Sequence, residues 1–255
     1  RSRSYQWKRW YHVAVFETPR KIFDDACIHF VFLVFWGLFF ISGYLAYEDR
    51  LWPDFAADVI GEEELDQFEE MYTGFGTRSV GDNYQMMGFY VFNNAGIGLS
   101  CFVWMLLILP GLVTLTFNAV YLGAVFGYMF RPDMGEAGIN FKNFVTAHGP
   151  FELTAIILAA GAGLKIGLSW LNTKGLSRFD SLAQTARATL PIAMCAVILF
   201  VLAAMIEGFI SPLPESVLPW WVKGLVGIAS SCCLMIYFVC LGYPRRQHTR
   251  GGPLF

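Results

Sequence analysis

The chain has 255 residues, of which 56% are hydrophobic and only 15% are charged. Because a soluble domain usually carries about 25% charged residues, this composition excludes an ordinary soluble globular protein. The formal net charge of −2 is uninformative alone, since the placement of Lys and Arg matters more than their sum in a membrane protein. We therefore expect an all-α, polytopic transmembrane helix bundle.

Residues 1–25 mix basic and aromatic side chains, including Trp7, Arg9 and Trp10. Such a mixture suits a helix that lies in the headgroup region of the bilayer, so we predict a cytoplasmic, amphipathic interfacial segment that is broken at Pro19. An apolar run begins at residue 26, which argues against nucleic acid as the partner of this basic segment.

Residues 26–243 contain six apolar segments, and the length of each is close to the roughly 20 residues that a helix needs to cross hydrocarbon. The predicted spans are residues 26–46, 86–109, 112–130, 144–168, 190–210 and 222–241. Pro110-Gly111 is expected to form the turn between the second and third spans. The polar segment 131–142 is expected to link the third and fourth spans, and a surface helix over 177–188 to precede the fifth.

The longest polar stretch, residues 48–84, holds eleven acidic residues. Within it, Leu65, Phe68 and either Met71 or Tyr72 recur at helical spacing with acids on the other faces. We predict one or two short amphipathic helices that rest on the outer surface. They are expected to form either a solvated cap or a docking surface for a basic partner or for cations.

The distribution of basic residues predicts the orientation. With six spans, 13 of the 18 Lys and Arg residues lie on the side of the termini. By the positive-inside rule, both termini, including the tail 244–255, are expected in the cytoplasm, and the acidic loop 48–84 outside.

Several polar residues fall inside the predicted spans. His148 and Glu152 are four positions apart, on one face of a helix, and Glu207, Asn93 and Asn94 are expected at a similar depth. Ionisable residues inside a membrane are costly and often functional, so these side chains are candidates for one outward-facing polar chamber. In the alternative, Glu207 reaches water at the interface and the two amides only hold helices together.

Other residues are candidates for contacts between helices. The amide of Asn118 is expected to hydrogen-bond across helices, because a buried amide needs partners. Small residues let helix backbones approach closely. The candidate packing residues are Gly123 and Gly127 in the third span and Gly161, Gly163 and Gly167 in the fourth.

The motifs of common enzymes are absent from the sequence, which shows no phosphate-binding loop, serine nucleophile motif or His-Glu-x-x-His signature. His148 and Glu152 resemble two ligands of a metal site, but zinc sites need more ligands than these two. We therefore expect no enzyme activity, no cofactor and no metal.

Three polar elements occur in order along the chain: Asn93-Asn94, Asn118 followed by Gly123, and His148-Gly-x-x-Glu152. In this order they resemble the stage II sporulation protein M family of bacterial and archaeal integral membrane proteins, over roughly residues 20–243. The resemblance implies a six-helix protein of the bacterial cytoplasmic (inner) membrane. In endospore formers, the member that gives the family its name helps to anchor and localise peptidoglycan-degrading proteins during engulfment. The resemblance implies no established reaction.

Two functions are compatible with these features. The first is a non-enzymatic membrane scaffold that forms homo-oligomers or organises other membrane proteins within the lipid bilayer. The second is a channel or permease for an ion, a proton or a lipid-linked substrate. In that case His148, Glu152 and Glu207 would form the relay, and a separate ATPase would supply the energy.

Overall fold

The computed structural model describes residues 3–48, 50–73 and 80–244, and every regular element in these ranges is a helix. Five of the described helical segments are long and apolar enough to cross a membrane. They are α3 (Ala26–Tyr47), α7 (Leu109–Met129), η2 (Pro132–Met134) with α8 (Gly135–Leu171), α9 (Arg178–Phe209), and α10 (Trp220–Met235) with η3 (Ile236–Cys240). In α6 (Val80–Met105), Asn94–Met105 is a shorter apolar stretch. A helical membrane protein is confirmed, whereas the six-span count and the orientation remain predictions.

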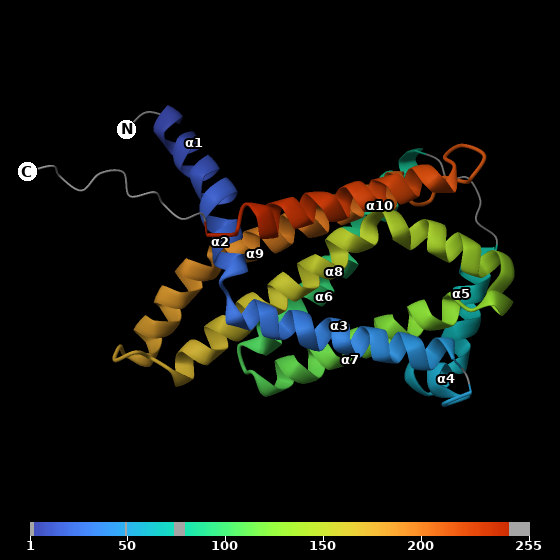
Figure 1. Cartoon of the computed structure of the whole chain (residues 1–255), viewed down its shortest axis with the longest axis horizontal. Helices are drawn as coiled ribbons and strands as arrows, with labels where there is room; N and C mark the ends of the chain where they lie inside the picture. The colour runs from blue at the N-terminus through green and yellow to red at the C-terminus, as the bar shows by residue number, and fades with distance from the viewer. Residues whose placement is uncertain (1–2, 49, 74–79, 245–255) are drawn as a thin grey trace, which may run out of the picture.

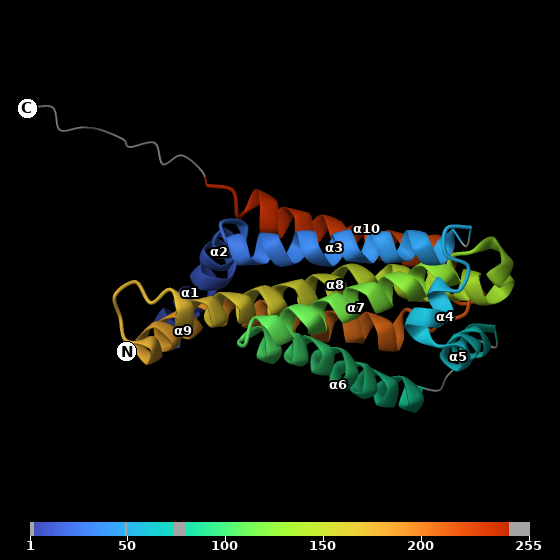
Figure 2. The ribbon, with the colours of Figure 1, turned by 90° about the horizontal axis from the view of Figure 1, so that it is seen from below.

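Helix α8 occupies the middle of the bundle. Figures 1 and 2 show α3 and α7 side by side along it, and Figure 2 shows α10 on one side of α8 and α9 and α6 on the other. Most of the second half of α8 is buried and rich in Ala and Gly. These small side chains allow several neighbours to reach the α8 backbone, which explains its central place.

The glycines of two helices lie where neighbouring backbones come closest. A Cβ atom at Gly123 or Gly127 of α7 would overlap backbone carbonyls of α3, and one at Gly163 or Gly167 of α8 would overlap carbonyls at the end of α6. A Cβ at Gly161 would crowd Ile28 of α3, 2.8 Å from its side chain. All five predicted packing glycines therefore lie at close contacts between helices.

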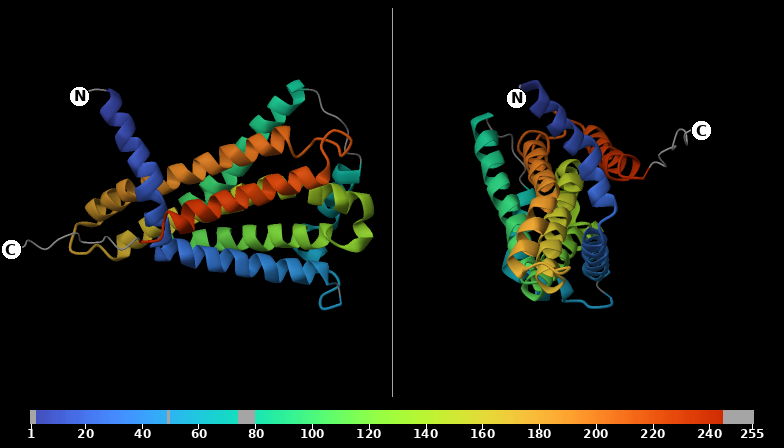
Figure 3. Two further views of the ribbon diagram at one scale, coloured as in Figure 1. Left: turned by 45° about the horizontal axis from the view of Figure 1, so that its top comes forward. Right: turned by 90° about the vertical axis from the view of Figure 1, so that its left-hand side faces the viewer.

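The N-terminal segment forms α1 (Arg3–His12), the π-helix η1 (Val13–Glu17) and α2 (Thr18–Phe23). Pro19 does not break the helix as predicted: the helical turns run without interruption from α1 through η1 and α2, with a π-helical turn just before the proline. The break comes at Asp24. Helix α1 projects from the bundle (Figure 3) and exposes Trp7, Trp10 and Tyr11. Its location in the headgroup region remains a prediction.

Three predicted boundaries differ from the structure. The turn between the second and third predicted spans lies at residues 106–108 and not at Pro110-Gly111. Helix α7 begins at Leu109, with Pro110 in its first turn. The polar link 131–142 is short, because α8 begins at Gly135 and runs through Pro150. The surface helix 177–188 and the fifth span form the single helix α9, which contains Pro191. Packing on neighbouring helices stabilises a helix across a proline that would end it in isolation.

The acidic loop forms two short helices, α4 (Phe55–Ile60) and α5 (Glu62–Thr73), at the end of the bundle opposite α1 (Figures 1 and 2). Leu65 and Tyr72 of α5 are buried, while Met71 is exposed, so Tyr72 completes the predicted apolar face. The Tyr72 ring meets Phe141 of α8 edge-on, with 5.2 Å between the ring centroids. Below, α4 and α5 together are called the acidic cap.

Candidate functional site

Helix α8 positions His148 and Glu152 one turn apart. The distance from His148 Nε2 to Glu152 Oε2 is 3.6 Å. Between them, Pro150 lacks the N–H that would bind the Thr146 carbonyl in a regular helix. Gly227 of α10 packs so closely against this carbonyl that a Cβ there would overlap it. The proline therefore removes one regular backbone hydrogen bond of α8 at the point where Gly227 of α10 packs against this helix.

Helix α9 brings Glu207 to the same place. Its Oε1 lies 4.0 Å from His148 Nε2, and its Oε2 accepts a hydrogen bond of 3.1 Å from the Asn94 amide of α6. The side chains of His148, Glu152 and Glu207 are 5%, 16% and 8% exposed. One possible ligand atom from each lies within 4.8 Å of the others. We call these three residues with Asn94 the polar cluster.

The cluster continues into two residues that the sequence analysis did not single out. The Ser211 hydroxyl lies 3.0 Å from His148 Nδ1. The Lys223 ammonium of α10 donates to the Ser211 carbonyl at 2.8 Å and to the Leu213 carbonyl at 2.7 Å. Lys223 follows Trp220-Trp221 at the start of an apolar run, and an ionisable residue in that position is the signal that could have identified it. Ser211 gave no comparable signal.

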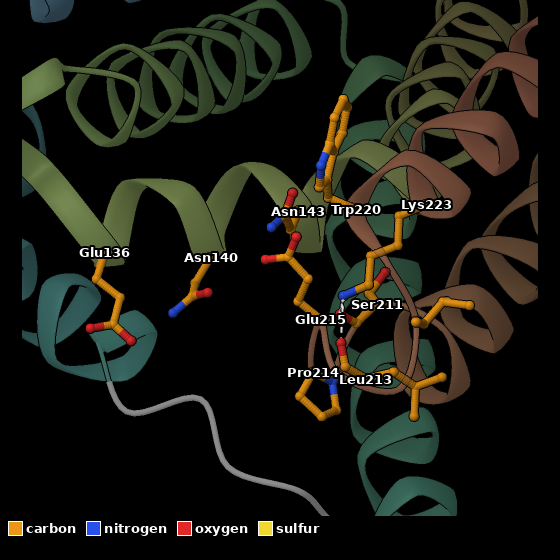
Figure 4. Close-up of a pocket in the computed structure, with 10 residues that line it drawn as sticks. Glu136, Asn140, Asn143, Ser211, Leu213, Pro214, Glu215, Trp220 and Lys223 are labelled. Atoms are coloured by element: carbon orange, nitrogen blue, oxygen red, sulfur yellow. Dashed lines mark hydrogen bonds between the residues drawn. The ribbon is translucent and has the colours of Figure 1, made fainter.

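A small pocket of about 100 Å³ opens beside the cluster. In Figure 4, Lys223 reaches toward Ser211 and Leu213, while Glu136 and Asn140 project from the first turns of α8. Ser211 lines this pocket and also contacts His148. One lining residue of the pocket therefore lies within hydrogen-bond distance of the buried imidazole.

Of the other two predicted polar residues, Asn118 lies apart from the cluster. The Asn118 amide donates to the Thr114 carbonyl of its own helix at 2.8 Å and lies 3.9 Å from the Cys101 sulfur of α6. Its cross-helix contact is therefore a weak one to sulfur. The side chain of Asn93 lies outside the described residues.

The polar cluster has two chemical capacities. A carboxylate and an imidazole can exchange a proton once side-chain rotation brings them to hydrogen-bond distance, or through one water, and an imidazole with two carboxylates can bind a cation. Burying carboxylates away from water is costly unless hydrogen bonds or positive charge compensate them. The Asn94 amide supplies one such hydrogen bond to Glu207.

Comparison with known proteins identifies a family match. The family model described as "Stage II sporulation protein M" matches residues 26–212. No curated protein and no solved structure matches the chain. The matched range includes the whole polar cluster and Ser211, and it ends before α10 with its Lys223.

Proposed function

This chain belongs to the stage II sporulation protein M family, and we propose that it acts as a non-enzymatic membrane scaffold. In this proposal a rigid helix bundle holds the acidic cap outside the bacterial cytoplasmic membrane. There the cap binds basic surfaces of partner proteins, and both termini lie in the cytoplasm.

The fixed position of the acidic cap is the observation that supports this proposal most. The Tyr121 and Tyr128 hydroxyls of α7 donate to Glu64 and Glu69 of α5, each at 2.5 Å. In addition, Asn140 of α8 donates to the Tyr72 carbonyl at 2.7 Å. The cap is thus attached to two long helices by side-chain hydrogen bonds, in addition to its buried apolar face.

The outer face of the cap remains available to a partner. Glu63, Asp66 and Glu70 are exposed on α5. A set of like charges on a rigid support attracts a partner of opposite charge and steers its approach. This arrangement supports a docking role for the cap in addition to simple solvation.

The polar cluster supports a scaffold in a second way. It joins α6, α8 and α9, and Ser211 and Lys223 extend it to α10. Hydrogen bonds between helices stabilise their association inside a bilayer. We infer that the network keeps the bundle rigid, so that the cap is presented in one orientation.

Photocrosslinking in living cells tests the docking role. A photoreactive amino acid at Gln67, an exposed position of α5, is expected to yield crosslinked complexes, either with another membrane protein or with a second copy of this chain. The combined changes Glu63→Lys, Asp66→Lys and Glu70→Lys should reduce these adducts at least about tenfold, because they reverse the charge of the surface. Asp24→Lys, at the other end of the bundle, is the matched control. Adducts that persist after charge reversal would contradict the proposal.

Transport remains the second candidate, because three ionisable groups converge within the membrane-spanning helices. Reconstitution in liposomes separates it from the scaffold. A transporter should carry protons or cations at a rate that Glu152→Gln lowers, whereas a scaffold should give negligible flux with either protein.

A further inference from the structure

We propose that His148, Glu152 and Glu207 bind a divalent transition-metal cation of the Zn²⁺ class. This inference does not depend on the scaffold function. From the sequence, His148 and Glu152 are only two ligands, too few for a zinc site. The structure brings a third, Glu207, from α9 to the same imidazole nitrogen.

The spacing of the ligand atoms suits such an ion. In a tetrahedral site with bonds of about 2.1 Å, neighbouring ligand atoms lie roughly 3.4 Å apart. His148 Nε2 is 3.6 Å from Glu152 Oε2 and 4.0 Å from Glu207 Oε1. Contractions of about 0.2 and 0.6 Å bring these two pairs to the tetrahedral spacing. The ligand atoms of all three residues lie within 4.8 Å of one another, so the two carboxylate oxygens need to approach by at most about 1.4 Å, which rotation of the two Glu side chains can supply. Three protein ligands leave a fourth position for water.

The surroundings of the imidazole hold it in the required orientation. A metal-bound histidine usually donates a hydrogen bond from the N–H of its other ring nitrogen to an oxygen, which fixes the tautomer and the ring plane. Here His148 Nδ1 lies 3.0 Å from the Ser211 hydroxyl. The ring also meets the Phe144 ring edge-on, with 5.2 Å between the ring centroids. With the proton on Nδ1, the lone pair of Nε2 points toward the two carboxylates.

The Asn94 amide orients one of the proposed ligands, Glu207. Asn94 donates to Glu207 Oε2, whereas Oε1 is the oxygen nearer to His148. The carboxylate is thereby oriented with one oxygen on the amide and the other toward the cluster. Hydrogen bonds of this kind from residues behind the ligands are typical of metal sites.

Charge balance favours a divalent ion. Two carboxylates inside a bundle of apolar helices are costly to bury without compensating positive charge. One divalent cation supplies two positive charges and binds both carboxylates. The nearby Lys223 ammonium is already bound by the carbonyls of Ser211 and Leu213.

Zinc binding by the purified full-length chain tests the inference. The protein in detergent is treated with a chelator, titrated with Zn²⁺, freed of unbound ion by gel filtration and analysed by mass spectrometry for metal content. The parent is expected to retain about one Zn²⁺ per chain. Glu207→Gln, Glu152→Gln and His148→Gln should each weaken binding at least about tenfold, because each removes a ligand.

Two controls separate this site from other effects. Glu215→Gln removes a carboxylate that lines the pocket but is not a ligand, so it should bind Zn²⁺ like the parent. Cys232→Ser with Cys233→Ser removes the exposed thiols of α10, and it should also leave this Zn²⁺ in place. Zn²⁺ should raise the melting temperature of the parent and of both controls, and this readout also shows that each variant is folded.

Three results would overturn the inference. One is less than about a tenth of an equivalent of Zn²⁺ on the parent, since a built three-ligand site binds close to one. Another is a folded Glu207→Gln protein that binds Zn²⁺ as tightly as the parent. The third is loss of the ion with the two cysteine changes alone, which would assign it to the thiols.

Discussion

His148 of α8 and Glu207 of α9 face each other with 4.0 Å between Nε2 and Oε1, although the link between their helices lies at the other end of the bundle (Figure 1). Their meeting depends on how α8 and α9 are rotated about their axes. Because Glu207 also accepts a hydrogen bond from Asn94, it connects three helices. Glu207 is therefore the residue whose replacement should affect the packing of these helices most.

The Asn94–Glu207 hydrogen bond should contribute measurably to stability. Double-mutant cycles in membrane proteins give such bonds about 0.6 kcal/mol on average and up to about 1.7 kcal/mol. A cycle built from Asn94→Leu, Glu207→Leu and the double variant should give a coupling energy in that range in reversible unfolding in detergent micelles. Additive effects of the two changes would contradict the contact.

The glycines at the crossing of α3 and α7 should tolerate no side chain. A methyl group at Gly123 would overlap the Phe39 carbonyl, whereas one at Gly37 of α3 meets nothing within 4 Å. Gly123→Ala should lower the free energy of unfolding by about 1–3 kcal/mol, the usual cost of overpacking. Gly37→Ala should leave it unchanged or raise it, because Ala favours helix.

Thermal unfolding in detergent compares these two alanine variants directly. They introduce the same methyl group, so the difference between them isolates the close approach of the backbones. Equal melting temperatures for the two variants would show that α3 and α7 do not cross at Gly123.

The sequence predicted the elements of this fold better than their contacts. The first predicted span, residues 26–46, nearly coincides with α3 (Ala26–Tyr47), because an apolar run of that length has few alternatives in a bilayer. Hydropathy assigns residues to depth, and similar depth made Glu207 a candidate partner of His148. It gives no rotation about the helix axis, so it did not distinguish a contact with His148 from exposure to water.

Other features depended on contacts that no local pattern encodes. Lys223 lies inside the predicted sixth span, 222–241, and was given no role there, yet it is buried and binds two carbonyls. The Asn118 amide donates its hydrogen bond to a carbonyl of its own helix and not to a neighbouring helix. Which acceptor it reaches depends on the side-chain rotamer. Lys165 lies inside the predicted fourth span, 144–168, and no partner was predicted for it, although it forms an ion pair with Asp25.

The ion pair between Asp25 and Lys165 should stabilise the start of α3. Asp25 is buried and also accepts a hydrogen bond of 3.0 Å from the Cys27 N–H, so it caps the helix. Loss of such a cap costs about 1 kcal/mol, and loss of the ion pair adds to it. Asp25→Ala should therefore lower the melting temperature in detergent. Lys165→Met should lower it too, because it leaves the buried Asp25 carboxylate without its counter-charge. A Lys165→Met protein that melts like the parent would contradict the ion pair.

The central claim is that a rigid bundle holds the acidic cap on the side of the membrane opposite the termini. Labelling of single introduced cysteines with a membrane-impermeant maleimide in right-side-out vesicles tests it most directly, with the parent's own cysteines as the baseline. Glu63→Cys on the cap should react at once, and Arg9→Cys on α1 only after detergent opens the vesicles. If Glu63→Cys is protected until the vesicles are opened, or Arg9→Cys reacts in intact ones, the claim is wrong.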